Sequence, residues 1–161
     1  MITTFLVEHR WVAPALLLLL LIVCPLVGSW LTRHGLVTRW LSAVSVLAVL
    51  ALTLVPTDRQ LEVGCTVQWA LPMWGRVELV ANVALFAAPV MLLGLLLRRP
   101  AVAFLGGAAF SALIETVQAV LPAIGRSCDT TDWLSNAIGS GIGALLAVVA
   151  LHLARRRPRI G

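Results

Sequence analysis

The amino-acid sequence contains five long apolar runs separated by short polar segments, and these runs constrain the fold more than any other feature. They cover residues 11–31, 40–55, 79–97, 101–121 and 134–154. A helix that crosses a membrane needs about 20 predominantly apolar residues, with a range of roughly 17–25. Four runs meet this length, and the second falls just short of it. Because a bilayer offers no water to backbone groups, each run is expected to form a helix.

The composition agrees with a membrane protein. Hydrophobic residues make up 60% of the 161 residues and charged residues 12%, whereas soluble domains have roughly 45–50% and about 25%. The net charge of +5 comes from arginines that are dispersed between apolar runs. They form no basic face interleaved with aromatic residues, which argues against nucleic-acid binding. We therefore expect an all-α, polytopic transmembrane helix bundle with five spans.

The distribution of charge predicts the orientation of this bundle. One set of segments carries only basic residues: Arg33, Arg39, Arg98, Arg99, Arg155, Arg156, Arg157 and Arg159. The opposite segments and the nearest halves of the runs carry Arg10, Arg59, Arg76, Arg126, Glu8, Asp58, Glu62, Glu78, Glu115, Asp129 and Asp132. Cytoplasmic loops are enriched in Lys and Arg. The N-terminus is therefore expected outside and the C-terminus in the cytoplasm.

Two cysteines, Cys65 and Cys128, fall in the two loops that this orientation places outside. Disulfides persist in oxidising extracellular compartments. Since sequence alone carries no geometry, a disulfide and two separate free thiols both stay open.

Polar side chains inside the apolar runs are the candidate functional residues, because such groups are costly in lipid. The turn at 98–100 makes the third and fourth runs an antiparallel hairpin. At 1.5 Å per residue, Asn82 and Glu115 both lie about 23 Å from that turn, and Asn136 lies about 28 Å from the cytoplasmic end of its run. Gln118 is one turn further out. Glu78, Arg126, Asp129 and Asp132 continue outward. We expect one polar layer near the outer membrane face.

Spacing within the helices favours convergence of these side chains. Three groups share a helix face by i, i+3 or i, i+4 spacing: Glu78 with Asn82, Ser111 with Glu115 and Gln118, and Asp132 with Asn136. Glycines at 139, 141 and 143 would let the fifth helix approach a neighbour closely. That approach would bring Asn136 near the polar face of another helix.

Each candidate also has a structural interpretation that stays open. Glu78 could be a first-turn acid favoured by the helix dipole, and Asp129 with Asp132 could form a capping box. Arg126 could be a loop arginine paired with an acid. The three amides could be interhelical hydrogen-bonding groups: Asn82, Gln118 and Asn136. Glu115 points most strongly to function, because an ionisable group well inside a span needs a partner, a proton or water.

Three stretches also resemble the VanZ-like family of bacterial membrane proteins. They are ELVANVALF at 78–86, SALIETVQ at 111–118 and RSCDTTDWLSNAIG at 126–139. The first two runs match only as generic apolar helices, and Val90 follows Pro89 where the family often has glycine. The resemblance divides the chain into two N-terminal helices with an external loop (1–77), a VanZ-like three-helix core (78–154) and a basic cytoplasmic tail (155–161).

The resemblance implies a multi-pass protein of the bacterial plasma membrane with a role in the cell envelope. The founding member is associated with resistance to teicoplanin, a glycopeptide antibiotic. The family's candidate positions transfer to Asn82, Glu115, Gln118, Arg126, Asp129, Asp132 and Asn136.

The first functional hypothesis is an outward-facing site that binds or modifies a cell-envelope amphiphile, either a lipid-linked precursor or a phospholipid headgroup. Glu115, Asp129 and Asp132 would be catalytic, with Glu115 as general acid or base. Arg126 would bind a phosphate or carboxylate. The amides of Asn82, Gln118 and Asn136 would orient the substrate. No cofactor is required, although the two aspartates could hold a divalent cation, and no definite nucleophile is present.

The second hypothesis is a non-catalytic membrane accessory protein whose polar layer holds the helices together. The sequence indicates no particular protein partner. A transporter is disfavoured, because five spans are few, no inverted repeat is present and the cytoplasmic half lacks a polar path.

Overall fold

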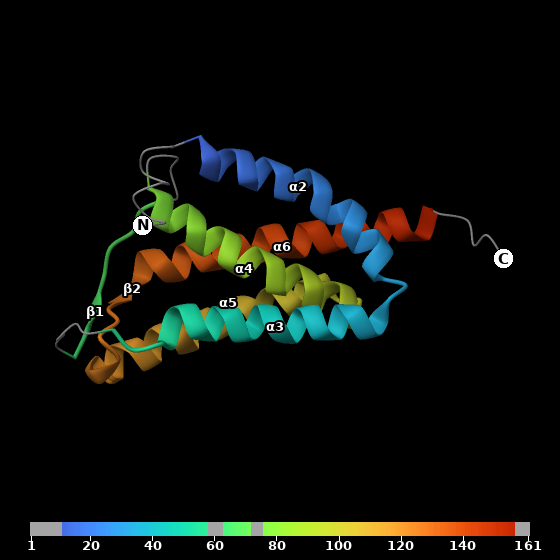
Figure 1. The fold of residues 1–161 in the computed structure, drawn as a ribbon. Coiled ribbons are helices and arrows are strands. Elements are labelled where there is room, and N and C mark those ends of the chain that lie inside the picture. Colours follow the sequence, from blue (N-terminus) through green and yellow to red (C-terminus); the bar gives the residue numbers. More distant parts are fainter. Residues whose placement is uncertain (1–10, 58–62, 72–75, 157–161) are drawn as a thin grey trace.

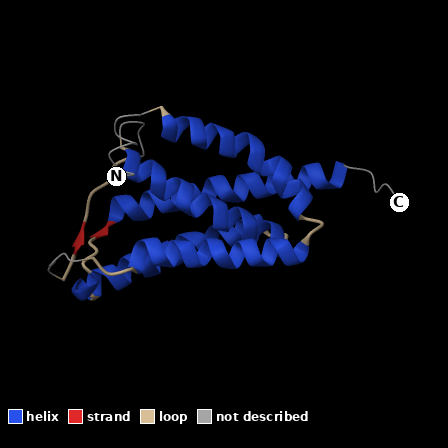
Figure 2. Ribbon diagram, viewed as in Figure 1, coloured by secondary structure: helices blue, strands red, loops and turns tan. Residues whose placement is uncertain are grey.

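The computed structural model describes residues 11–57, 63–71 and 76–156, which form a bundle of long helices (Figure 1). The α-helices are α2 (Val12–Leu31), α3 (Gly35–Leu54), α4 (Val77–Leu97), α5 (Pro100–Val120) and α6 (Thr130–Arg156). A short 3-10 helix, η1 (Pro122–Ile124), follows α5, and two short strands, β1 (Cys65–Thr66) and β2 (Cys128–Asp129), pair in parallel (Figure 2). Seven charged residues used for the predicted orientation lie outside the described residues: Glu8, Arg10, Asp58, Arg59, Glu62, Arg157 and Arg159.

The helical fold is confirmed, and four of the described helices are long and apolar enough to cross a membrane. These are α3, α4, α5 and α6, while α2 contributes a shorter apolar stretch, Leu21–Leu31. The count of five spans and the orientation stay predictions.

Two helix boundaries differ from the sequence prediction. The second run was expected to begin at residue 40, but α3 begins at Gly35 and is 20 residues long. Arg39 lies exposed inside the helix rather than at its end. The fifth run was expected over 134–154, but α6 extends to both sides and includes Asp132 in its first turn and Arg155 in its last. Counting apolar residues misses such charged end turns, although the helix dipole favours acids at the start and bases at the end.

Helices α4 and α6 form the closest pair in the bundle, and glycines make this approach possible. A Cβ atom on Gly139 would collide with the carbonyl oxygen of Val83, and one on Gly143 would collide with that of Ala87. Gly141 lies on a different side, where a Cβ would make ordinary contact with Phe104 at 3.8 Å. Two of the three glycines therefore serve the predicted close approach.

A disulfide between Cys65 and Cys128 joins the two loops at one end of the bundle. These cysteines are opposite each other in the β1–β2 pair. The alternative of two free thiols is therefore wrong. Thr57, which follows α3, is tied to the same end, because its Oγ1 donates to the Gly125 carbonyl at 2.6 Å and its N–H donates to that of Ile124 at 2.9 Å.

Candidate functional site

A cavity of about 670 Å³ lies at the end of the bundle that carries the disulfide. Six of the seven sequence candidates line it: Asn82, Glu115, Gln118, Arg126, Asp132 and Asn136. They come from α4, α5, α6 and the loop between α5 and α6. The structure therefore brings together side chains that are up to 54 positions apart, from Asn82 to Asn136.

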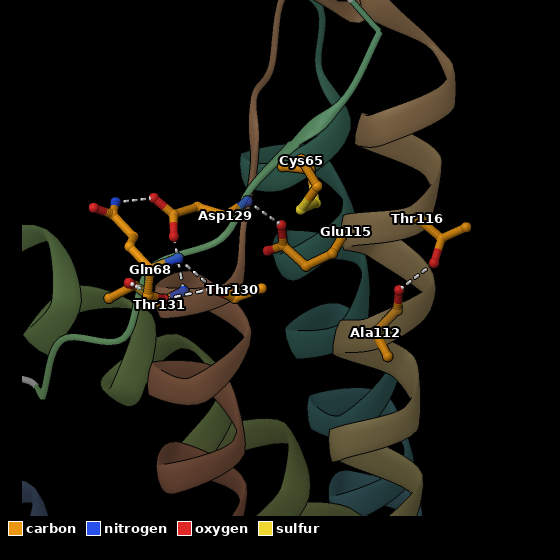
Figure 3. Close-up of a disulfide and its surroundings, with 9 residues drawn as sticks. Cys65, Gln68, Ala112, Glu115, Thr116, Asp129, Thr130 and Thr131 are labelled. Atoms are coloured by element: carbon orange, nitrogen blue, oxygen red, sulfur yellow. Dashed lines mark hydrogen bonds between the residues drawn. A yellow bond between two sulfur atoms is a disulfide. The ribbon is translucent and has the colours of Figure 1, made fainter.

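Glu115 is buried in the last third of α5, and its carboxylate holds the start of α6. Its Oε2 accepts a hydrogen bond from the backbone N–H of Asp129 at 2.9 Å (Figure 3). That N–H belongs to the peptide that follows Cys128, so Glu115 and the disulfide fix the same short strand. In a capping box, an acid in the helix itself accepts this N–H. Here a neighbouring helix supplies the acid.

Asp129 caps α6 and points away from the main cavity. Its Oδ1 accepts from the backbone N–H of Thr131 at 2.7 Å, as expected of an N-cap residue. Its Oδ2 accepts from the side-chain amide of Gln68 (Figure 3). Asp129 lines a smaller hollow of about 170 Å³, which it shares with Glu115, Trp133 and the disulfide. Of the seven candidates, Asp129 is the one that does not line the main cavity.

Asp132 does line the cavity, but it is not the partner of Asp129 in a capping box. Its Oδ1 accepts a hydrogen bond from Asn82 Nδ2 at 2.8 Å, which joins α6 to α4. Within the described part of the chain, no cluster of three His, Cys, Asp or Glu side chains could hold a metal ion.

Gln118 and Arg126 both bind the C-terminal end of α3. Gln118 Nε2 donates to the carbonyl of Thr53 at 2.9 Å, and Arg126 Nε donates to that of Val55 at 3.3 Å. The last carbonyls of a helix have no partner within the helix. Among residues 11–57, 63–71 and 76–156, the Arg126 side chain has this carbonyl as its partner rather than the acid considered from the sequence.

Asn136 is 3% exposed and forms the inner wall of the cavity. Its Nδ2 donates to Ser111 Oγ at 2.9 Å, whereas its Oδ1 has no hydrogen-bond partner among the described residues. Exchanging the two amide atoms would satisfy the oxygen and leave the nitrogen unpaired. An unpaired buried polar atom costs about 1–3 kcal/mol, and this one is buried beneath the cavity surface rather than exposed to it.

Sequence reasoning missed the contribution of α3 and of the loop beside it. Leu52, Thr53 and Thr57 line the cavity, as do Gly125 and Ser127. The second run was treated as a generic apolar helix, and nothing in its pattern marks residues 52–57 as part of a site. Gly125 could have been found, because it follows Pro122 in a turn-forming stretch, and it has the left-handed φ of 66° that favours glycine.

Comparison with known proteins extends the resemblance seen within 78–139 over most of the chain. The model of the VanZ/LLP1 family matches residues 11–151, which include α2 and α3. No curated protein and no solved structure matches the chain. The chain therefore belongs to the VanZ/LLP1 family of membrane proteins.

Proposed function

We propose that this protein, in the bacterial plasma membrane, binds or modifies a cell-envelope amphiphile in its polar cavity. The amphiphile would be a lipid-linked precursor or a phospholipid, with its headgroup in the cavity. The observation that carries the proposal is the convergence of six polar or charged candidate side chains on one cavity of about 670 Å³. Polar side chains inside a membrane-spanning bundle are costly, so a polar headgroup in the cavity would give these side chains partners.

Two features support an outward-facing cavity with a cytoplasmic C-terminus. The disulfide Cys65–Cys128 lies at the cavity end, and disulfides persist in oxidising compartments outside the cytoplasm. The far end carries the arginine-only segments: Arg33, Arg39, Arg98, Arg99, Arg155 and Arg156. Such segments face the cytoplasm under the positive-inside rule.

Different side chains around the cavity would bind different groups of the ligand. Arg126 uses Nε for the Val55 carbonyl, so its two terminal nitrogens can hold a phosphate or carboxylate by paired hydrogen bonds. Glu115 uses Oε2 for Asp129, so Oε1 can accept a proton or a hydrogen bond from a ligand hydroxyl. A divalent cation on Asp129 and Asp132 stays a prediction, and metal analysis of the purified protein before and after chelation would test it.

The direct test is mass spectrometry of lipids that co-purify with the full chain. The wild type would be compared with Glu115→Gln, Arg126→Ala and the control Thr116→Val. Thr116 neighbours Glu115 but is exposed and bonds to Ala112 of its own helix (Figure 3). We expect one headgroup class to be depleted in both cavity variants and kept in the control. Identical lipid profiles in all four proteins would contradict the proposal.

A non-catalytic accessory role is the second candidate, and the interhelical hydrogen bonds favour it. Asn82 with Asp132 links α4 to α6, and Gln118 with Thr53 links α5 to α3. In that case, removing these side chains lowers the thermal stability in detergent and leaves the co-purifying lipids unchanged. Measuring both quantities on the same variants separates the two functions.

A link to glycopeptide resistance is the most specific form of the proposal. A protein that handles an envelope precursor would alter the amount or accessibility of the glycopeptide target. We expect deletion to lower the inhibitory concentration of teicoplanin, wild-type protein to restore it, and Glu115→Gln to fail to do so at equal abundance. An unchanged concentration after deletion would contradict this form.

A further inference from the structure

A second hollow, of about 210 Å³, lies deeper in the bundle than the polar cavity. Its walls come from α3, α4 and α5: Val46, Val49, Phe86, Pro89, Val90, Leu93, Gly106, Gly107 and Phe110. We call it the apolar groove, since no polar side chain of the described residues lines it.

The apolar groove lies next to the polar cavity along the same helices. Leu52 lines the cavity and Val49 lines the groove, three residues apart on α3. On α4, Leu85 lines the cavity and the next residue, Phe86, lines the groove. A step of three residues along a helix is about 4.5 Å. The residues that line the two hollows therefore change from polar near the end of the bundle to apolar toward its middle.

The apolar groove is open because α3 and α5 barely meet. Helix α3 packs mainly on α4 and has few contacts with α5. On the α5 side, Gly106 is exposed, and a Cβ atom there would meet no described heavy atom within 4 Å. Gly107, beside it, forms the bottom of the groove. A Cβ atom there would collide with the side chains of Val90 and Ser140.

The size of the apolar groove decides between two kinds of occupant. From Phe86 to Leu93 it follows α4 for about 10 Å, so a volume of about 210 Å³ leaves a narrow slot. A helix of a partner protein is about 10–12 Å across and does not fit into such a slot. A single hydrocarbon chain does fit, and these helices are apolar enough to be surrounded by lipid.

We infer that the apolar groove holds one hydrocarbon chain of the amphiphile whose headgroup occupies the polar cavity. This inference rests on the proposed function. Lipid tails are as apolar as the groove, so the chain gains little hydrophobic free energy by entering it. The groove instead fixes the position and direction of the chain, which presents the headgroup to Arg126 and Glu115. The ligand class is then a membrane-resident amphiphile, and a free water-soluble headgroup would bind poorly.

The test uses the full chain in lipid nanodiscs with a photoreactive phosphatidylethanolamine, which carries a diazirine midway along one acyl chain. In the wild type, we expect label on residues 86–93 and 106–110. Gly106→Phe should fill the groove and reduce this label roughly tenfold, equivalent to about 1.4 kcal/mol. The matched control is Ala109→Phe, which adds bulk at an exposed position of α5 outside the groove. Gly106→Leu, checked for wild-type thermal stability, is the second variant if the phenylalanine prevents folding.

The outcomes separate the inference from the proposed function. If wild type and both Gly106 variants are labelled equally while Arg126→Ala loses its co-purifying lipid, the groove does not hold the chain. The proposed headgroup site then still stands. Labelling that depends on Gly106 but ignores Arg126→Ala overturns the proposed function. Excess unlabelled phosphatidylethanolamine and excess polyprenyl phosphate, added in separate arms, show whether the displaced chain is acyl or polyprenyl. A wild type without label in the groove overturns the inference directly.

Discussion

The two seams of the bundle, α4 with α6 and α3 with α5, are built in opposite ways. The first is closed, because Gly139 and Gly143 let α6 lie against the backbone of α4. The second is open, and both the polar cavity and the apolar groove lie along it, with further walls from α4 and, for the cavity, α6. Close backbone packing and the Asn82–Asp132 hydrogen bond stabilise the closed seam. Hydrogen bonds from Gln118 and Arg126 to the end of α3, together with the disulfide, stabilise the end of the open seam. The comparison suggests a scaffold in the first seam and a site in the second.

The strongest way to break the comparison is Gly139→Val, which forces a side chain into the Val83 carbonyl. We expect the free energy of unfolding to fall by at least about 3 kcal/mol, because the backbone of α4 cannot move aside as a flexible side chain can. The control is Gly141→Val on the same helix, where the space is open apart from Phe104. Thermal unfolding followed by size-exclusion chromatography in detergent measures both. Equal stability of the two variants would show that the seam is not closed as described.

The next largest effect concerns the disulfide at the open seam. Replacing Cys65 and Cys128 together by alanine should lower stability by about 2–4 kcal/mol, since the bond closes a loop of 63 residues. The apparent melting temperature of the wild type should also fall under reductant. The double variant should not respond to reductant, although it keeps Cys24 as a free thiol. A response of the double variant would assign the effect to another group.

Glu115 allows the structural and functional roles of one side chain to be separated. Glu115→Ala leaves the Asp129 N–H without its acceptor and should cost about 1–3 kcal/mol. Glu115→Gln keeps an oxygen that can accept this hydrogen bond, so its melting temperature should stay near the wild-type value while lipid binding falls. If the glutamine variant is as unstable as the alanine variant, the role of Glu115 is to stabilise the fold rather than to bind a ligand.

The smallest effect is expected for Gln118, which bridges the open seam through the Thr53 carbonyl. Gln118→Met keeps the length of the side chain and loses one hydrogen bond of a half-buried group, so about 0.5–1.5 kcal/mol should be lost. Chemical denaturation or thermal scanning detects this. A loss of stability as large as that expected for Gly139→Val would mean that contacts across the open seam contribute as much to the stability of the fold as those across the closed seam.

Much of the fold follows from the sequence because apolar length is decisive in a bilayer. The distances of Asn82 and Glu115 from the turn at 98–100, and of Asn136 from the cytoplasmic end of its run, were enough to predict that the third, fourth and fifth runs share one polar layer. The boundaries of α3 and α6 were less predictable, because their end turns contain charged residues that hydropathy assigns to loops.

The part of the candidate site that escaped prediction depends on contacts between distant segments. Asp129 turns from the cavity because Gln68, 61 residues earlier, binds its carboxylate. Thr57 reaches the site because it binds Gly125 across 68 residues. Neither pairing leaves a local pattern, so no periodicity or spacing could have indicated it.

Arg98 ends α4 with a left-handed φ of 53°, a conformation that glycine adopts with less strain. A glycine there would ease the bend, but it would remove one of the two adjacent arginines from the turn between α4 and α5. The backbone at this corner thus accepts strain while keeping a charge that, in the predicted orientation, belongs on the cytoplasmic side of the membrane. If that prediction holds, the compartment to which the cavity opens depends on charges at the opposite end of the bundle, far from the cavity itself.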